Sequence, residues 1–152
     1  AAADERARQI AELLAIVRAV PGEGGVWSGL GAGKHWSQTG KPPPMPKAAI
    51  LMGDFNLTPK DAEYDFLVGR RELAYGRAST MDGLFDCWTR SGGGELDGDT
   101  FLRPARGERP EAWDRIDYAF ATIELWHHVK SMRVGLDAVG SDHQPIFLEL
   151  VT

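Results

Sequence analysis

The sequence predicts an α+β fold, in which one long helix comes first and strand-like segments follow. Residues from about Asp4 to Val20 carry apolar side chains at helical spacing, and these form one stripe: Ile10, Leu13, Leu14 and Val17. Further along the chain, short apolar runs of strand length end in polar turns. The chain has 152 residues, of which 43% are hydrophobic, so it is long enough to bury the core of one domain.

Local signals predict where the helices begin and end. Asp4 and Glu5 suit the N-terminus of the first helix, where negative charge opposes the helix dipole, and Pro21-Gly22 predicts its end. A second helix is predicted to open at Thr58-Pro59-Lys60-Asp61, with Thr58 as its cap, and to run to about Val68.

Between these helices, residues 21–46 predict a long irregular loop. The segment holds seven glycines and five prolines, which disfavour regular structure. We expect a loop of this length to be either functional or an insertion of variable structure in the domain.

Four segments predict strands. The run Ala48–Met52 is continuously apolar and predicts a buried strand that ends in Gly53-Asp54-Phe55-Asn56. Residues 115–120 alternate polar and apolar side chains, as a half-buried strand does. Two more strands are predicted at 129–136 and 145–151.

Composition excludes several classes of protein. Seventeen basic and 22 acidic residues give a net charge of −5, which argues against a protein that coats nucleic acid by bulk charge. Cys87 is the single cysteine, so no disulfide forms within the chain. No apolar run approaches the roughly 18 residues that a membrane span requires, and no secretion signal is visible at the N-terminus. The sequence does not indicate a compartment.

Polar side chains follow three of the strand-like segments. They are Asp54 with Asn56, then Asp117, then Asp142 with His143. Each group alone is most simply a turn or cap. Together they predict one shared polar site, whose oxygen ligands suit Mg²⁺ or Mn²⁺ and whose chemistry suits hydrolysis of a phosphate ester.

These three groups also resemble a known family. Gly53-Asp54-Phe55-Asn56, Arg115-Ile116-Asp117-Tyr118 and Ser141-Asp142-His143 are similar, in this order, to three signatures of the endonuclease/exonuclease/phosphatase superfamily. Asp86-Cys87-Trp88 and Thr100-Phe101 resemble the family's spacing more loosely. The resemblance implies the DNase I-like fold, a four-layer α/β/β/α sandwich.

The resemblance also implies a role for each residue. Asp54 would orient or deprotonate the attacking water, and Asn56 would hold that water or a phosphate oxygen. Asp117 would align His143, and His143 would stabilise the charged transition state. Asp142, together with Asp54, would bind the divalent metal ion.

The resemblance covers only the second half of such a domain. Nothing before Asp54 is similar to the first-half motifs, which include the glutamate that is the family's principal metal ligand. Residues 1–152 are therefore expected to be the C-terminal half, with the insertion at about 21–46. An isolated half would expose one sheet face, so we expect it to need the N-terminal half, or self-association, as a partner.

Two functions remain open from the sequence. The first is a Mg²⁺-dependent phosphodiesterase, nuclease or phosphatase, whose substrate is nucleic acid or a small or lipid phosphoester. The alternative is a binding or structural half-domain that lacks catalysis because the metal-binding glutamate is absent.

Overall fold

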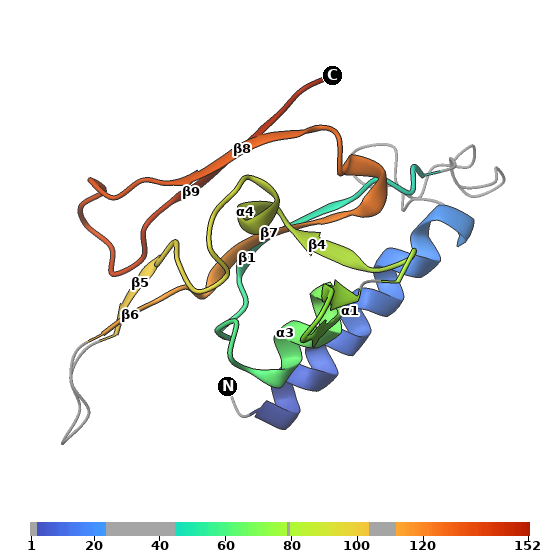
Figure 1. The fold of residues 1–152 in the computed structure, drawn as a ribbon, viewed down its shortest axis with the longest axis horizontal. Helices are drawn as coiled ribbons and strands as arrows, with labels where there is room; N and C mark the ends of the chain where they lie inside the picture. The colour runs from blue at the N-terminus through green and yellow to red at the C-terminus, as the bar shows by residue number, and fades with distance from the viewer. Residues whose placement is uncertain (1–2, 24–44, 79, 104–111) are drawn as a thin grey trace, which may run out of the picture.

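The computed structural model describes residues 3–23, 45–78, 80–103 and 112–152, and it confirms the mixed helix and strand character (Figure 1). The helices are α1 (Ala3–Glu23), α3 (Ala62–Val68), α4 (Cys87–Arg90) and the 3-10 helix η1 (Ile123–Leu125). The strands are β1 (Ile50–Asp54), β2 (Arg70–Glu72), β3 (Gly76–Ala78), β4 (Leu84–Asp86), β5 (Phe101–Arg103), β6 (Ala112–Asp114), β7 (Asp117–Thr122), β8 (Val129–Val134) and β9 (Ile146–Leu150). Most of the predicted insertion lies outside the described residues.

The centre of the fold is an antiparallel sheet with the order β1-β7-β4. Three antiparallel pairs accompany it: β2-β3, β5-β6 and β8-β9. The strands predicted at 115–120, 129–136 and 145–151 are confirmed as β7, β8 and β9, with ends that differ by a few residues.

Strand β7 separates two apolar cores, because successive side chains of a strand point to opposite faces. Tyr118 and Phe120 pack with side chains from α1 and α3 on one face. Ala119 and Ala121 pack with Val129 and other side chains from α4 and the β8-β9 pair on the other face. Figure 1 shows the resulting layers, with α1 and α3 below the central sheet and β8-β9 above it.

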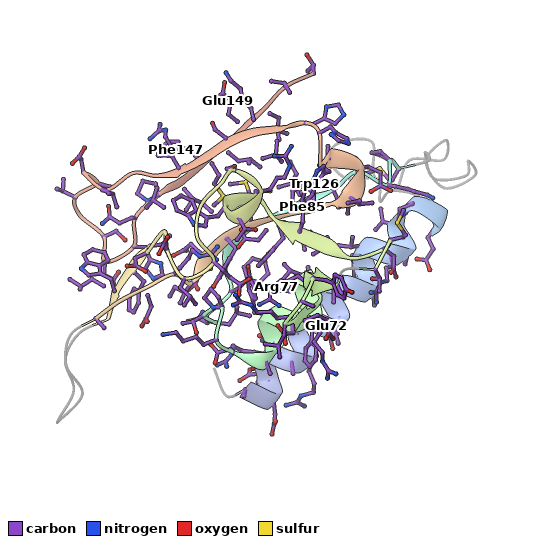
Figure 2. The ribbon with its side chains drawn as sticks, in the orientation of Figure 1. Glu72, Arg77, Phe85, Trp126, Phe147 and Glu149 are labelled. Carbon is purple, nitrogen blue, oxygen red and sulfur yellow. The ribbon has the colours of Figure 1, made fainter. Side chains whose placement is uncertain are left out.

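The second core continues beyond β7. Figure 2 shows Phe85 of β4 beside Trp126, and their rings meet edge to face with centroids 5.0 Å apart. Cys87, the first residue of α4, is also buried in this core, and burial raises the pKa of its thiol to about 12. Cys87 is therefore a small apolar core residue, protonated at neutral pH.

Both predicted helices differ from the structure at one end. α1 continues past Val20 to Glu23, with Pro21 inside its last turn, where the missing N–H removes one helical hydrogen bond without ending the helix. α3 begins at Ala62, one turn later than predicted. Thr58 does not cap it, because the Thr58 amide and hydroxyl donate to Asp61 Oδ2, at 2.7 and 2.9 Å, and form a separate turn.

A strand forms at the predicted run Ala48–Met52, but the prediction that this strand is buried was wrong. β1 lies at the edge of the central sheet and pairs only with β7 among the described residues. Ile50 and Met52 lie opposite Ala121 and Ala119 and are 38% and 50% exposed. Leu51 alone packs against the helical core, because the described elements cover only that face of β1.

Among the described helices, none is both long enough and apolar enough to cross a bilayer.

Candidate active site

The first two sequence motifs meet across neighbouring strands. Asp54 is the last residue of β1 and Asp117 is the first residue of β7, and the antiparallel register places them directly opposite each other. Side chains of such a pair lie on the same face of the sheet, with Cβ atoms about 5 Å apart. The register therefore brings two carboxylates together at one end of the central sheet.

A tight turn after β1 fixes the Asp54 carboxylate. Asn56 donates to it twice, from its amide N–H to Oδ1 at 2.7 Å and from Nδ2 to Oδ2 at 3.0 Å. Asn56 adopts φ +52°, a left-handed conformation that asparagine tolerates better than most residues. The amide of Phe55 donates to the carbonyl of Ile116 at 2.9 Å, which anchors this turn to the residue before Asp117.

The third motif reaches the same place from the connection between β8 and β9. His143 Nδ1 lies 2.9 Å from Asp117 Oδ2. A carboxylate is an acceptor only, so Nδ1 carries the proton and donates. The His143 amide also donates to Ser141 Oγ at 3.1 Å, which shapes the turn that delivers the ring.

The electrostatic environment favours the charged form of this imidazole. The hydrogen bond to Asp117 is the main cause that raises the pKa of His143. Burial opposes it, and the charges of Asp117, Asp54 and Asp142 raise the pKa further. The ring is one-third exposed and the Asp117 carboxylate is mostly buried. The site therefore holds an imidazole that can carry positive charge and still meet solvent or substrate.

Asp142 is exposed, and its main chain is held in place by a neighbouring strand. Its carbonyl accepts from the amide of Leu102 in β5 at 3.1 Å. Its carboxylate acts on His143 through charge, so it belongs to the same electrostatic neighbourhood. The structure thus gathers all five predicted residues at one end of the central sheet: Asp54, Asn56, Asp117, Asp142 and His143.

Two cavities flank the end of β1, and both reach Met52 and Gly53. One, of about 540 Å³, is lined by Asp117 and His143. The other, of about 350 Å³, is lined by Asp54 and Asn56. Four of the five candidate residues therefore line open space beside the end of β1, whereas Asp142 lines neither cavity.

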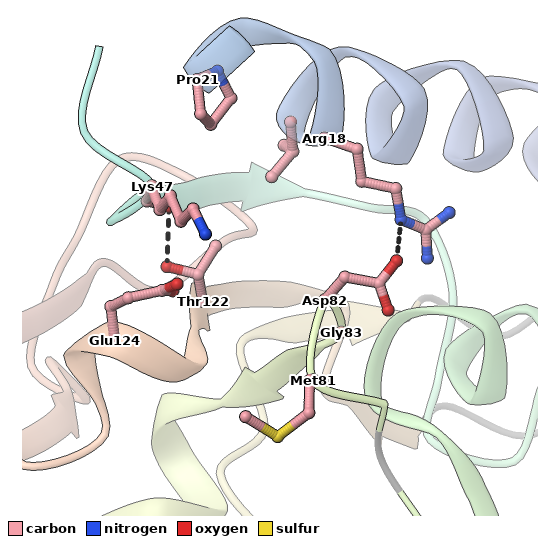
Figure 3. A pocket seen from close by; sticks show the side chains of 9 residues that line it. Arg18, Pro21, Lys47, Met81, Asp82, Gly83, Thr122 and Glu124 are labelled. Carbon is pink, nitrogen blue, oxygen red and sulfur yellow. Dashed lines mark hydrogen bonds and ion pairs between the residues drawn. The ribbon is translucent and has the colours of Figure 1, made fainter.

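A third cavity, of about 300 Å³, lies elsewhere in the fold. Figure 3 shows it between the end of α1, the segment before β1 and η1, with the Arg18–Asp82 ion pair on one side. None of the five candidate residues lines it. Its position gives it no part in the site.

The described residues do not by themselves make a complete metal centre. In residues 3–23, 45–78, 80–103 and 112–152, no three His, Cys, Asp or Glu side chains are grouped so that they could hold one ion. Asp54 and Asp142 offer carboxylate oxygens of the type that Mg²⁺ binds. Two carboxylates are too few to hold a metal ion by themselves, so the described residues do not fit a resident metal on their own.

Sequence reasoning missed a buried ion pair beneath the site. Arg115 donates from Nη1 to Asp86 Oδ2 at 2.5 Å, and both residues are 2% exposed. Tyr64 also donates to Asp86 Oδ2, at 2.7 Å, and the Arg115 guanidinium lies 4.6 Å from the centre of the Tyr118 ring. The loose resemblance around Asp86 was the one available signal, but the alternation of residues 115–120 gave no hint that Arg115 points inward.

Comparison with known proteins agrees with these motifs. The sequence model of the Endonuclease/Exonuclease/phosphatase family matches residues 35–143, which include the three motifs. No curated protein and no solved structure matches the chain significantly. The match covers well over half of the 152 residues, and the chain therefore belongs to the endonuclease/exonuclease/phosphatase family.

Proposed function

We propose that this chain carries catalytic residues of a phosphoester hydrolase. The observation that supports this most directly is the Asp117–His143 hydrogen bond directly beside the Asp54–Asn56 turn. Members of the family are generally hydrolytic enzymes, and most use divalent metal ions. The substrate would be nucleic acid or a small or lipid phosphoester.

The proposed reaction is attack of water on phosphorus, in line with the leaving oxygen. Asp54 accepts hydrogen bonds through both carboxylate oxygens and would orient the water or take its proton. Asn56 donates one of its two Nδ2 hydrogens to Asp54, so the other hydrogen and the side-chain carbonyl would hold the water or a phosphate oxygen.

Asp117 and His143 would together stabilise the negative charge of the transition state. With Nδ1 committed to Asp117, the other ring nitrogen of His143 would donate to a phosphate oxygen. The raised pKa keeps the imidazole positively charged over a wider pH range, which stabilises negative charge that builds up in the transition state. Asp54 and Asp142 would supply oxygen ligands to a Mg²⁺ or Mn²⁺ ion.

Hydrolysis of bis(p-nitrophenyl) phosphate and of p-nitrophenyl phosphate, with and without Mg²⁺, tests the proposal. His143→Ala and Asp54→Asn should each lower kcat by about a hundredfold or more, since each removes an acid–base or charge-stabilising group. The exposed His127→Ala is the matched control and should retain full turnover. Absence of turnover above background in the wild type would favour the alternative, a binding half-domain without catalysis, whereas equal turnover in the wild type and His143→Ala would refute the role of His143.

We also propose that the chain forms the C-terminal half of the family's domain. The exposure of Ile50 and Met52 on the edge strand β1 supports this, because an apolar sheet face is normally covered by another layer. The covering layer would be the N-terminal half or a second copy of this chain.

A further inference from the structure

Thr100 lies immediately before β5 and is completely buried. It belongs to none of the three motifs, and its side chain lines none of the cavities beside the site. Its side-chain and main-chain hydrogen bonds nevertheless reach the motif that contains Asp117, and also Gln144, the residue directly after the motif that contains His143.

The hydroxyl of Thr100 holds the start of β7. Its Oγ1 accepts from the amide of Asp117 at 3.0 Å and from the amide of Ile116 at 3.2 Å. The Thr100 amide donates to the carbonyl of Asp114 at 3.1 Å. Thr100 therefore holds the backbone that carries the Asp117 carboxylate, in addition to the pairing of β7 with β1.

Thr100 and the next two residues, Phe101 and Leu102, hold the segment that carries His143. The Thr100 carbonyl accepts from the amide of Gln144 at 2.6 Å, and Leu102 donates to Asp142 as described above. Phe101 forms an isolated bridge with His143, and their rings lie with centroids 4.8 Å apart. The chain from Thr100 to Leu102 thus runs between the Asp117 segment and the His143 segment.

We propose that Thr100 is a positioning residue that sets the distance between Asp117 and His143. Asp117 belongs to the central sheet and His143 to the connection between β8 and β9, so no single sheet fixes their separation. Thr100 contacts both segments, and the acceptor on its side chain is what ties the Asp117 segment. The proposal rests on the proposed function of Asp117 and His143.

Replacing the hydroxyl by a methyl group of similar size isolates this effect. Thr100→Val leaves the buried amides of Ile116 and Asp117 without their acceptor, whereas Thr100→Ser keeps it. Thr89→Val is the matched control, because it also removes a partly buried threonine hydroxyl, one that donates to the carbonyl of Asp86 and not to the segments of Asp117 or His143.

We expect Thr100→Val to lower kcat for bis(p-nitrophenyl) phosphate by roughly 10- to 100-fold, with KM changed by less than about twofold, because displacement of a catalytic pair slows the chemical step. Thr100→Ser should stay within about threefold of the wild type in kcat. In the Asp117→Asn background, Thr100→Val should cause little further loss, since both changes would act through the same group.

A second measurement does not depend on activity. Amide hydrogen exchange, followed by NMR, should accelerate at Asp117 and Gln144 in Thr100→Val and remain as in the wild type in Thr100→Ser and Thr89→Val. If Thr100→Val does not fold, Thr100→Cys replaces it, because sulfur is a weaker acceptor and should produce a smaller change of the same kind.

The inference would be overturned if Thr100→Val had the same kcat and the same amide exchange rates as the wild type. The same outcome in Thr100→Cys would overturn it where that variant is used. An equal loss in Thr100→Ser would also overturn it, because shape and not the hydroxyl would then be responsible. Full turnover in both Asp117→Asn and His143→Ala would instead refute the proposed function, while the exchange measurement would still test the tie to Thr100.

Discussion

At the scale of single residues, polar groups that are buried or tightly paired support the end of the sheet that bears the site. Arg115 and Asp86 form the most deeply buried ion pair among the described residues, directly before the Ile116-Asp117 segment. A second arginine, Arg77, which is labelled in Figure 2, pairs with Glu95 through two parallel hydrogen bonds at 2.7 and 2.8 Å.

Arg115→Met should destabilise the fold by about 3–5 kcal/mol, because it leaves the Asp86 carboxylate buried without its charged partner. Urea denaturation, followed by circular dichroism, measures the change. Lys130→Met is the control, since Lys130 and Glu149 form an exposed pair and its loss should cost less than about 1 kcal/mol. Similar midpoints for the two variants would show that the buried pair contributes no more than a surface pair.

Glu95→Gln should make stability less dependent on pH. The hydrogen bonds from Arg77 lower the pKa of Glu95 in the folded state, although burial opposes them. A lowered folded pKa means that Glu95 stabilises the fold above its unfolded pKa of about 4.3, and that this contribution is lost as the pH falls through the folded pKa.

The free energy of unfolding, measured from about pH 7 down to about pH 2, checks this sign. The wild type should exceed Glu95→Gln at neutral pH, and the difference should shrink under acid conditions. The exposed Glu72→Gln is the control. A difference that stays constant across the whole range would contradict the assignment.

At the scale of elements, the end of β1 depends on a backbone that glycine adopts easily. Gly53 has φ +151° inside the strand, one residue before Asp54. Gly53→Ala should therefore cost about 1–3 kcal/mol through strain alone, because no atom would crowd the added Cβ.

Thermal or urea unfolding of Gly53→Ala, compared with Gly22→Ala, tests this. Gly22 lies in α1, has no positive φ and also has open space at its Cβ position, so alanine there should be neutral or slightly stabilising. Equal effects at the two positions would mean that β1 relaxes to a conformation that alanine accepts.

Much of the element order could be predicted from the sequence, because helical stripes and apolar runs are local patterns. The five site residues could be proposed because they lie in short polar motifs beside strand-like runs, although Asp117 begins β7 and does not follow a strand. The exposure of β1 could not, because it depends on which elements cover each face of the sheet. Thr100 and the inward-facing Arg115 were missed because their roles arise from contacts between segments far apart in the chain.

At the scale of the whole molecule, the uncovered face of β1 predicts association. Ile50 and Met52 expose apolar area on an edge strand, which favours contact with another chain. The double variant Ile50→Ser/Met52→Ser should weaken concentration-dependent association in sedimentation velocity. Leu73→Ser, at a fully exposed leucine between β2 and β3, is the control and should leave association unchanged. A wild type that remains monomeric at all concentrations would argue against self-association.

The pairing of Asp54 with Asp117 has a consequence for the order of events during folding. These residues come from distant parts of the chain, and their pairing requires closure of a long loop, which is slow compared with helix formation. A refolding chain would therefore acquire its helices well before it acquires the geometry of the site. Recovery of catalytic competence would follow the slowest kinetic phase of refolding and would report the completion of the native topology.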